Sequence, residues 1–491
     1  MSQLLCLLIL VHTNLSVAPS LSLHDLHVLH GLIETMEFEV KRITNGPKHH
    51  LFGFHDLVQT NAKGDWALAL EVDDISHPPL PGESCLSGIV PAGGGEFIPV
   101  HKTHTWNYPQ GARQQWIGES DLSVCNDRDE NNKLVCRVSD ARERRVVETL
   151  QFPVHCLNAQ TRKTFGLNYD RIHACGGYGY TPGRVQKCPR KVNDIPDDDG
   201  IFIGDLDSRK SELLVSISQV AACGEIKPVR TGYPHYLTHL MLNPSGRRIA
   251  FLHRYRVPDG GEPTRLMTIG VDGTGLRCLA KGSLSHFTWI SDGEVFIWGK
   301  DERTLSKMRE SACLRIPGVL PAAMLAKRMI RVIRGGNKTK SNVDSKVQDR
   351  AFLVIKDNAD QVTIGKDGIG VLIEDGHPMA QPGNLHWLVS DTYPDPSGKR
   401  WLYFYDVSTK KRYDVAQFQR LFAVPDIQAF DWRFAEKGLD IRIARKFDRD
   451  DYLFYRSGYH TDLHPRWGTN GMAYFDSIHE GSRQVYMVSV S

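Results

Sequence analysis

The chain has 491 residues, of which 60 are lysine or arginine and 57 are aspartate or glutamate, giving a formal net charge of +3 at pH 7. Because acidic and basic residues are nearly balanced, the net charge gives no indication of a protein that binds nucleic acid or a membrane surface. No stretch reaches the roughly 18 consecutive apolar residues that a membrane-spanning helix needs. The length suits one large domain built from repeated strand units of about 45 to 70 residues each.

The N-terminus has features of a secretory leader. An apolar run covers Leu4 to Val11, and Ser16 to Ala18 offers the small side chains of a cleavage site. The pattern predicts a signal peptide at 1–18, an extension at 19–36 and a secreted protein. Because no Lys or Arg precedes the apolar run, an N-terminus that is merely apolar is the alternative.

The sequence predicts a first strand from Glu37 to Thr44. After this strand, one pattern recurs along the chain. It is a turn containing Gly, Asn or Asp, followed by four to six mainly β-branched and aromatic residues, as in a tight hairpin that leads into a buried strand. The turns lie within Asn61–Gly64, Trp116–Ser120, Asn158–Arg162, His239–Gly246, His286–Gly293, His377–Gly383 and the C-terminal stretch Asp462–Val490.

Each unit alone would leave an apolar face exposed to water, so the units must pack around a common axis. The sequence therefore predicts an all-β fold, a seven-bladed β-propeller over 37–491, with a β-sandwich as the alternative. Because the chain ends on a predicted strand, Gln484 to Val490, we expect the strand Glu37–Thr44 to join the C-terminal blade. Insertions between blades are predicted at about 171–200, 305–347 and 417–459.

The cysteines leave two interpretations open. Cys125 and Cys136 flank a polar turn, and Cys175 and Cys188 bracket a glycine-rich loop. Either pair forms a disulfide, or its members are buried small apolar residues.

A histidine precedes four of the turns at a nearly constant distance. His239, His286 and His464 lie seven positions before their turn glycine, and His377 lies six before its own. In a propeller the equivalent positions of the innermost strands face the axis. We therefore expect these four imidazoles to converge at one mouth of the central channel.

Several further phrases carry a resemblance that covers roughly His49 to the C-terminus. They are His49–Asp56, Trp106–Trp116, Asn126–Arg128, Tyr178–Tyr180, Ser390–Asp395 and Asp462–Trp467. Together they resemble the propeller polysaccharide lyases of the oligogalacturonate lyase and ulvan lyase type, with blade repeats similar to those of TolB-type propellers. The resemblance implies β-elimination on an acidic, uronate-bearing polysaccharide or oligosaccharide.

Such an elimination needs a group that neutralises the uronate carboxylate, a base for the C5 proton and an acid for the leaving O4. In the oligogalacturonate lyase version a divalent metal, Mn²⁺ or Zn²⁺, neutralises the carboxylate. We assign His286, His377 and His464 as its ligands, because imidazole nitrogens suit these ions. His239 is then the base, and His235 is the alternative base. The other interpretation is that these histidines only hydrogen-bond neighbouring blades.

In the ulvan lyase version, side chains take these roles. An extended segment from Asn168 to His173 would place Tyr169, Arg171 and His173 on one face. Arg171 would clamp the carboxylate, and Tyr169 or Tyr178 would protonate the leaving oxygen; an outward polar strand edge is the alternative. The residues predicted to bind substrate are Tyr178, Tyr180, Trp106, Arg466 and His55.

The sequence contains no Gly-x-x-x-x-Gly-Lys-Ser/Thr phosphate loop, no Gly-x-Ser-x-Gly elbow, no His-Glu-x-x-His pair and no Cys-x-x-Cys clip. ATP chemistry and hydrolysis through a covalent serine are therefore disfavoured. Two function classes remain: a polysaccharide lyase, or a non-catalytic secreted propeller that binds a glycan or protein. A monomer without nucleic-acid or membrane partners is expected in either case.

Overall fold

The computed structural model describes residues 37–175, 177–182, 194–225, 229, 231–257, 261–302, 310, 350–358, 361–419 and 457–490. The predicted leader and extension, Cys188 and most of the predicted insertions at 305–347 and 417–459 lie outside these ranges. No helix in the described part of the chain is long and apolar enough to cross a membrane.

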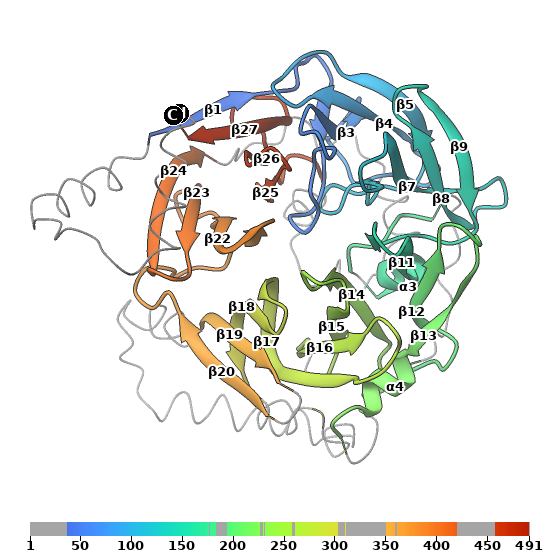
Figure 1. Cartoon of the computed structure of the whole chain (residues 1–491), viewed down its shortest axis with the longest axis vertical. Helices are drawn as coiled ribbons and strands as arrows, with labels where there is room; N and C mark the ends of the chain where they lie inside the picture. The colour runs from blue at the N-terminus through green and yellow to red at the C-terminus, as the bar shows by residue number, and fades with distance from the viewer. Residues whose placement is uncertain are drawn as a thin grey trace, which may run out of the picture. The chain divides into compact units, whose positions relative to one another are not determined.

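Antiparallel sheets make up almost all of the described chain (Figure 1), and the first three have four strands each. Their strands are β2 (His49–Leu51), β3 (Trp66–Val72), β4 (Cys85–Pro91) and β5 (Ile98–Thr103); β6 (Gln115–Trp116), β7 (Leu122–Arg128), β8 (Leu134–Asp140) and β9 (Arg145–Leu150); and β10 (Cys156–Asn158), β11 (Lys163–Leu167), β12 (Gly200–Asp205) and β13 (Ser211–Ser216).

The next sheet has seven strands in chain order, and two further four-stranded sheets follow it. These strands are β14 (His235–Leu242), β15 (Arg248–Tyr255), β16 (Thr264–Gly270), β17 (Arg277–Ser291), β18 (Glu294–Asp301), β19 (Ala351–Asp357) and β20 (Val362–Asp367); β21 (Met379–Gln381), β22 (Asn384–Asp391), β23 (Lys399–Asp406) and β24 (Lys411–Gln419); and β25 (Arg466–Trp467), β26 (Ala473–Ser477) and β27 (Gln484–Val490) beside β1 (Phe38–Arg42).

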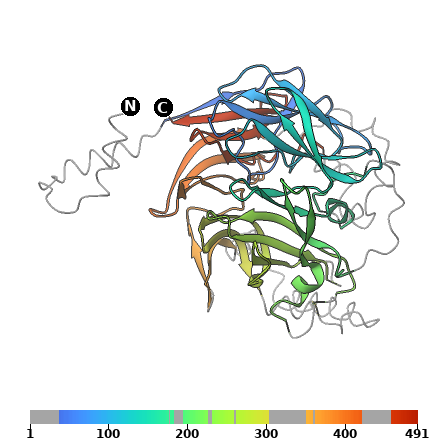
Figure 2. The same cartoon turned by 45° about the vertical axis from the view of Figure 1, so that its right-hand side comes forward.

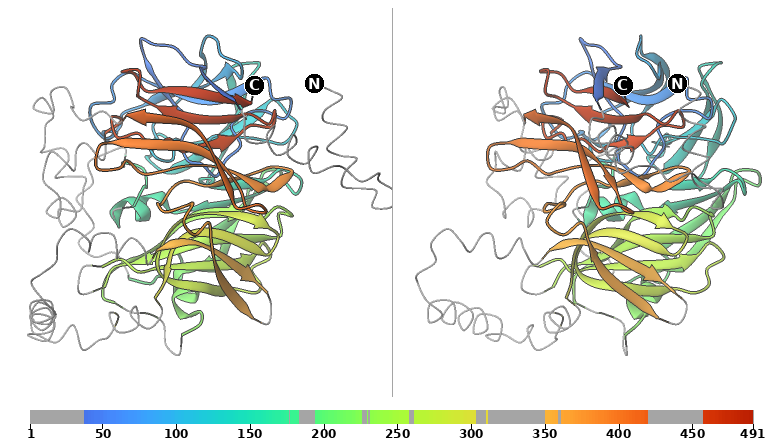
Figure 3. Two further views of the ribbon diagram at one scale, coloured as in Figure 1. Left: turned by 90° about the vertical axis from the view of Figure 1, so that its left-hand side faces the viewer. Right: turned by 60° about the vertical axis from the view of Figure 1, so that its left-hand side comes forward.

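Within the unit Val40–Val488 the sheets follow one another in chain order around a common centre (Figure 1). The turned views keep this order, with the orange sheet β21–β24 between the red C-terminal strands and the sheet β14–β20, whose colours run from green to light orange (Figure 2 and Figure 3). Consecutive four-stranded antiparallel sheets in this order define a propeller-type fold. The blade count of seven stays a prediction.

The recurring turns form the predicted hairpins. Gly246 separates β14 from β15, and Gly471 precedes β26, with φ angles of 68° and 77°. These left-handed conformations are those that glycine adopts without steric cost. The turn glycines recognised in the sequence therefore mark true hairpins.

The N-terminal strand lies where the sequence predicted it. β1 is the neighbour of β27 in the C-terminal sheet. Within the unit Val40–Val488, the Ile43 amide donates to the carbonyl of Val485 at 2.9 Å, and the Val485 amide donates to the Thr44 hydroxyl at 2.9 Å. The first and last described strands thus belong to one sheet.

One local prediction is wrong, and for Cys125 and Cys136 the structure agrees with the second of the two interpretations. The segment after Asn168 is not extended but forms a short helix, α3 (Tyr169–Ala174), because the Asn168 side chain caps it by accepting from the Arg171 amide. Cys125 and Cys136 do not face each other, because Cys136 is opposite Asn126 in the β7–β8 register. Adjacent strand residues point to opposite faces, and both cysteines are buried free thiols.

The core lies between neighbouring sheets. Phe165 and Ile201 of the β10–β13 sheet pack in one apolar cluster with Tyr236 and Phe251 of the next sheet. A second helix, α4 (Ile217–Ala222), adds Val220 to this cluster and begins with a capping box formed by Ser216 and Gln219. The rigid sheets hold the inner strand ends, and these carry the candidate site.

Candidate functional site

Two of the predicted histidines sit in β-bulges. The β14–β15 pairing stops after Thr238 and resumes at Met241, so His239 lies in the interruption, with a φ of 59°. The β17–β18 pairing is interrupted in the same way between Leu284 and Phe287, at His286. A bulge bends the strand and re-aims the side chain that it carries.

The other two histidines lie just before the first strand of their sheets. His377 precedes β21 by two residues, and His464 precedes β25 by two. His464 has a φ of 43°, an uncommon conformation for a residue other than glycine. All four histidines thus occupy inner ends of sheets, although by different local geometry.

The structure brings the four rings together. The distance between ring centroids is 6.4 Å for His239 and His286, 4.2 Å for His286 and His377, and 4.4 Å for His377 and His464. His55 joins them, with its centroid 5.4 Å from that of His377. We call His55, His239, His286, His377 and His464 the histidine cluster.

Phe54 fills the middle of the histidine cluster, which the sequence did not predict. Its ring centroid lies 4.7 Å from His239, 4.9 Å from His464 and 6.2 Å from both His286 and His377. Phe54 is only 3% exposed. An apolar ring at this position keeps water away from the imidazoles and favours their neutral forms.

Three members of the cluster contact an oxygen acceptor through Nδ1. His286 contacts Asp375 at 3.1 Å, His377 contacts Asp391 at 2.8 Å, and His55 contacts the carbonyl of Pro378 at 2.9 Å. The carbonyl can only accept, so the proton of His55 is on Nδ1 and a lone pair is on Nε2. The two carboxylates favour the same arrangement in His286 and His377, as outer partners of metal-binding histidines commonly do.

Several nitrogens of the cluster are buried without a hydrogen bond. Within the described ranges, the Nε2 atoms of His55 and His377 and the Nδ1 atom of His464 have no hydrogen-bond partner. A buried polar atom without a partner costs stability, and most buried polar atoms in proteins are paired. These nitrogens are thus available to a ligand.

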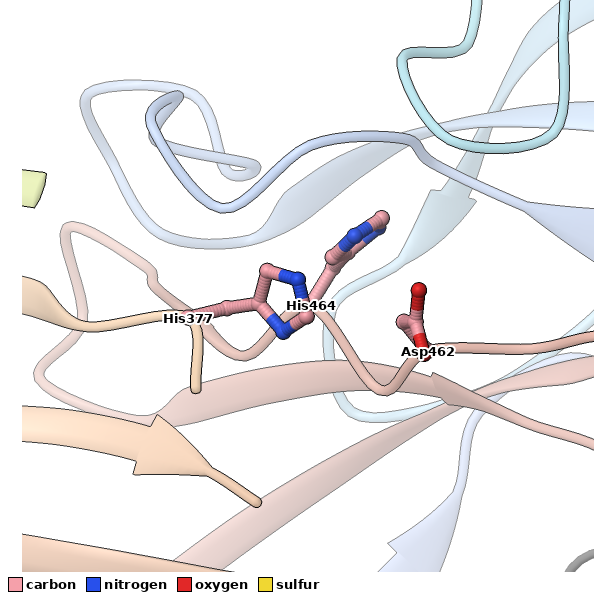
Figure 4. Close-up of side chains that lie close together, drawn as sticks. All are labelled: His377, Asp462 and His464. Atoms are coloured by element: carbon pink, nitrogen blue, oxygen red, sulfur yellow. The ribbon is translucent and has the colours of Figure 1, made fainter. Parts of the chain in front are cut away.

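Asp462 lies with two of these histidines in a group that could hold a metal ion (Figure 4). One ligand atom each from His377, Asp462 and His464 all lie within 4.8 Å of one another. The sequence-based ligand set had His286 in place of Asp462. Asp462 was missed, although its position two residues before His464 is a readable signal.

The pKa values in the cluster shift in opposite directions. Burial above all holds the pKa of His55, His239 and His464 well below the usual value. Burial also opposes protonation of His377, but the carboxylates of Asp391, Asp462 and Asp375 together outweigh it and raise the pKa of that histidine. Burial would raise the pKa of Asp462, yet His460, His377 and Arg400 together hold it well below its usual range.

The remaining predicted catalytic residues are held by other partners. Arg171 donates to the backbone carbonyls of His235, at 2.6 Å, and Asp194, at 3.0 Å. The Tyr169 hydroxyl lies 2.7 Å from Nδ1 of His155. The imidazole of His235 contacts His253 at 3.0 Å. Their predicted catalytic roles stay predictions.

The residues predicted to bind substrate divide into three groups. Tyr178 is 39% exposed, whereas Tyr180 and Trp106 are buried in the core. Arg466 is also buried and forms an ion pair with Asp476 at 2.6 Å. Of the five, His55 is the one that lies in the histidine cluster.

Fold and site together place the chain in the class of propeller-type all-β proteins. No protein-family model and no curated protein matches the sequence. Among solved structures, oligogalacturonate lyase from Vibrio parahaemolyticus is 11% identical, covering 93% of this chain and 97% of its own, with a TM-score of 0.48. An oligogalacturonate lyase in complex with manganese is 10% identical over 93% of this chain and 96% of its own, with a TM-score of 0.37.

The β-propeller domain of the Trilobed protease from Pyrococcus furiosus is also similar, at 11% identity over 75% of this chain and 85% of its own, with a TM-score of 0.37. TolB from Acinetobacter baumannii is 10% identical over 68% of this chain and 60% of its own, with a TM-score of 0.31. These values are too low to carry an activity from any of the four proteins to this chain.

Proposed function

We propose that this protein is a polysaccharide lyase that cleaves a uronate-bearing glycan by β-elimination at the histidine cluster. The carrying observation is the convergence of His239, His286, His377 and His464. His377 and His464 each have a buried ring nitrogen without a hydrogen-bond partner among the described residues. If these imidazoles served only to join blades, their buried nitrogens would be hydrogen-bonded to groups on neighbouring blades. The proposal includes secretion, as the N-terminal sequence suggests.

The proposal also includes seven blades. β17 has 15 residues, and it pairs with β16 through Arg277–Gly282 and with β18 through Gly282–Ser291. One strand therefore serves as the outer strand of one blade and the inner strand of the next. Divided at Gly282, the seven-stranded sheet gives two four-stranded blades beside the five four-stranded sheets.

A divalent ion of the Mn²⁺ or Zn²⁺ type fits the donors of the site. Nε2 of His377 and Nδ1 of His464 are buried and have no hydrogen-bond partner in the described part of the chain, and Asp462 adds a carboxylate beside them. These three residues would hold the ion, with His286 next to His377. When bound, the ion supplies positive charge against the substrate carboxylate.

His239 suits the role of base. Its pKa lies well below the usual histidine value, chiefly because of burial, so the imidazole is unprotonated at neutral pH. Its Nδ1 lies 2.8 Å from the Thr238 hydroxyl, which fixes the ring orientation. His239 would accept the C5 proton while the electron pair of the C–H bond forms the C4–C5 double bond and the C4–O4 bond breaks.

The test is ultraviolet detection of unsaturated product over a panel of uronate polymers, with and without chelator. Wild type is expected to make product, chelator to stop it and Mn²⁺ to restore it. His464→Ala is expected to lower kcat/KM on the order of 10³-fold. The matched control is His101→Gln, because His101 is a largely buried histidine that contacts Ser139 on another sheet.

Two outcomes would replace this proposal. If chelator leaves wild-type turnover unchanged and Arg171→Lys is damaging, the version with Arg171 as clamp and Tyr169 as acid holds instead. The second candidate, a binding module, is favoured by the burial of His377 and His464, at 1% and 3% exposure. Glycan binding without product from any polymer would establish it.

A further inference from the structure

Tyr393 lies at the edge of the histidine cluster, in the loop between β22 and β23. Its ring centroid is 5.4 Å from that of His377 and 6.0 Å from that of His286. The Tyr393 amide donates to the Asp375 carbonyl at 3.2 Å, which ties the loop to the residue that orients His286. Tyr393 is partly exposed, whereas His377 is buried. The phenol thus stands between the cluster and solvent.

The hydroxyl of Tyr393 differs from those of the tyrosines that support the fold. The hydroxyl of Tyr169 contacts His155 at 2.7 Å, that of Tyr236 donates to Glu262 at 2.6 Å, and that of Tyr405 donates to Asp367 at 2.6 Å. Within the described ranges, no hydrogen bond occupies the hydroxyl of Tyr393. Its O–H is therefore free to meet a substrate oxygen.

We propose that Tyr393 is a further catalytic residue, the acid that protonates the leaving O4 in the elimination. The role rests on the proposed lyase function. In this step the C4–O4 bond breaks with its electron pair on O4, O4 takes the phenolic proton of Tyr393, and water returns a proton to the phenolate. The C5 proton goes to His239, so protons and electrons balance.

Tyr393 is better placed to act as the acid than the tyrosine that the sequence first suggested. Its ring contacts those of His377 and His286, and within the described ranges no hydrogen bond occupies its hydroxyl. Tyr169, the earlier candidate, is fully buried and already contacts His155.

Tyr393→Phe removes the proton and leaves the ring. We expect kcat on the natural linkage to fall about 10²- to 10⁴-fold, with little change in KM or in Mn²⁺ affinity. On a synthetic uronide with a nitrophenolate at C4 the loss should nearly vanish, because that leaving group departs without a proton. Tyr405→Phe is the matched control: it loses the hydrogen bond to Asp367 and should keep wild-type kcat.

The possible failures are distinguishable. An active wild type with an unimpaired Tyr393→Phe variant overturns the role of Tyr393 and leaves the lyase proposal standing. An equal loss on both leaving groups also overturns the acid role, because the defect would then lie elsewhere. A wild type that makes no product from any uronate polymer overturns the lyase function and the acid together.

Discussion

Two buried regions contact the segment from Phe52 to Asp56: the histidine cluster and the ion pairs around Asp476. They differ in how many of their polar atoms have hydrogen-bond partners. Asp476 pairs with Arg466 at 2.6 Å and Arg483 at 3.5 Å, and accepts the Phe52 amide at 3.1 Å. The histidine cluster also holds this segment, through the contact of His55 with Pro378. Three of its nitrogens nevertheless lack partners among the described residues.

This difference in hydrogen bonding distinguishes a region that supports the structure from a region that can bind a ligand. A buried carboxylate between two guanidinium groups has its charge balanced and its lone pairs used, so it has no capacity left for a ligand. Buried imidazoles with free lone pairs cost stability and keep that capacity. We infer that Asp476 fixes the geometry of the centre, whereas the histidine cluster keeps ring nitrogens with which it can bind a ligand.

The largest expected effect is loss of stability in acid, which tests whether the buried histidines are neutral. Burial, with Arg113 beside His155 and with His235 and Arg265 beside His253, holds the pKa of both histidines well below the unfolded value of about 6.5. Below that pH the two histidines bind protons in the unfolded state but remain neutral in the folded state. Their stabilisation is thus complete above pH 6.5 and is lost as the pH falls.

Each such histidine should lower the free energy of unfolding by about 1.4 kcal/mol per pH unit below 6.5, and His55 and His239 add to the effect. Urea unfolding between pH 7.5 and 5, with chelator present, measures the slope. His253→Gln should reduce this slope by about 1.4 kcal/mol per pH unit, which corresponds to the uptake of one proton fewer on unfolding. A slope that this variant does not change would contradict the neutral state of His253.

The second prediction concerns the paired region. Asp476→Ala leaves Arg466 and Arg483 buried without their carboxylate, and should lower the free energy of unfolding by about 3–5 kcal/mol. Chemical denaturation measures the loss. The control is Glu480→Ala, because Glu480 is exposed and its 3.0 Å pair with Arg42 should contribute at most about 1 kcal/mol. Equal losses in both variants would show that the buried pairs of Asp476 contribute no more to stability than an exposed pair.

Much of this fold is encoded in local patterns that can be read directly. The turn glycines, such as Gly246 and Gly471, and the β-branched runs that follow them fix hairpins by backbone geometry alone. The common offset of the histidines predicted that four rings meet, because equivalent positions of repeated units occupy equivalent places in space.

What the sequence could not show depends on contacts between distant segments. Phe54 enters the centre because Gln114 and Asp476 hold Phe52, and these residues lie far apart in the chain. Asp462 joins His377 only through the packing of separate sheets. The helix α3 was missed for a different reason, since the alternation of Tyr169, Arg171 and His173 was given more weight than the capping signal of Asn168.

The smallest expected effect comes from Asn168→Ala. Asn168 accepts the Arg171 amide at 3.1 Å and donates to Asp199 at 3.0 Å, so its loss should cost about 1 kcal/mol of unfolding free energy, the usual cost of a lost helix cap. Like Asp476 it is a partnered polar group, but it is less buried and uncharged, so the cost is smaller.

Activity of the same variant tests which region does the chemistry. α3 carries Tyr169 and Arg171, the catalytic pair of the version without a metal. If the histidine cluster is the site, Asn168→Ala should keep kcat/KM within about twofold, because none of the proposed reacting groups lies on α3. A loss of 10²-fold or more with the expected small change in stability would shift the chemistry to α3, because a slightly displaced clamp loses transition-state contacts before it loses fold stability.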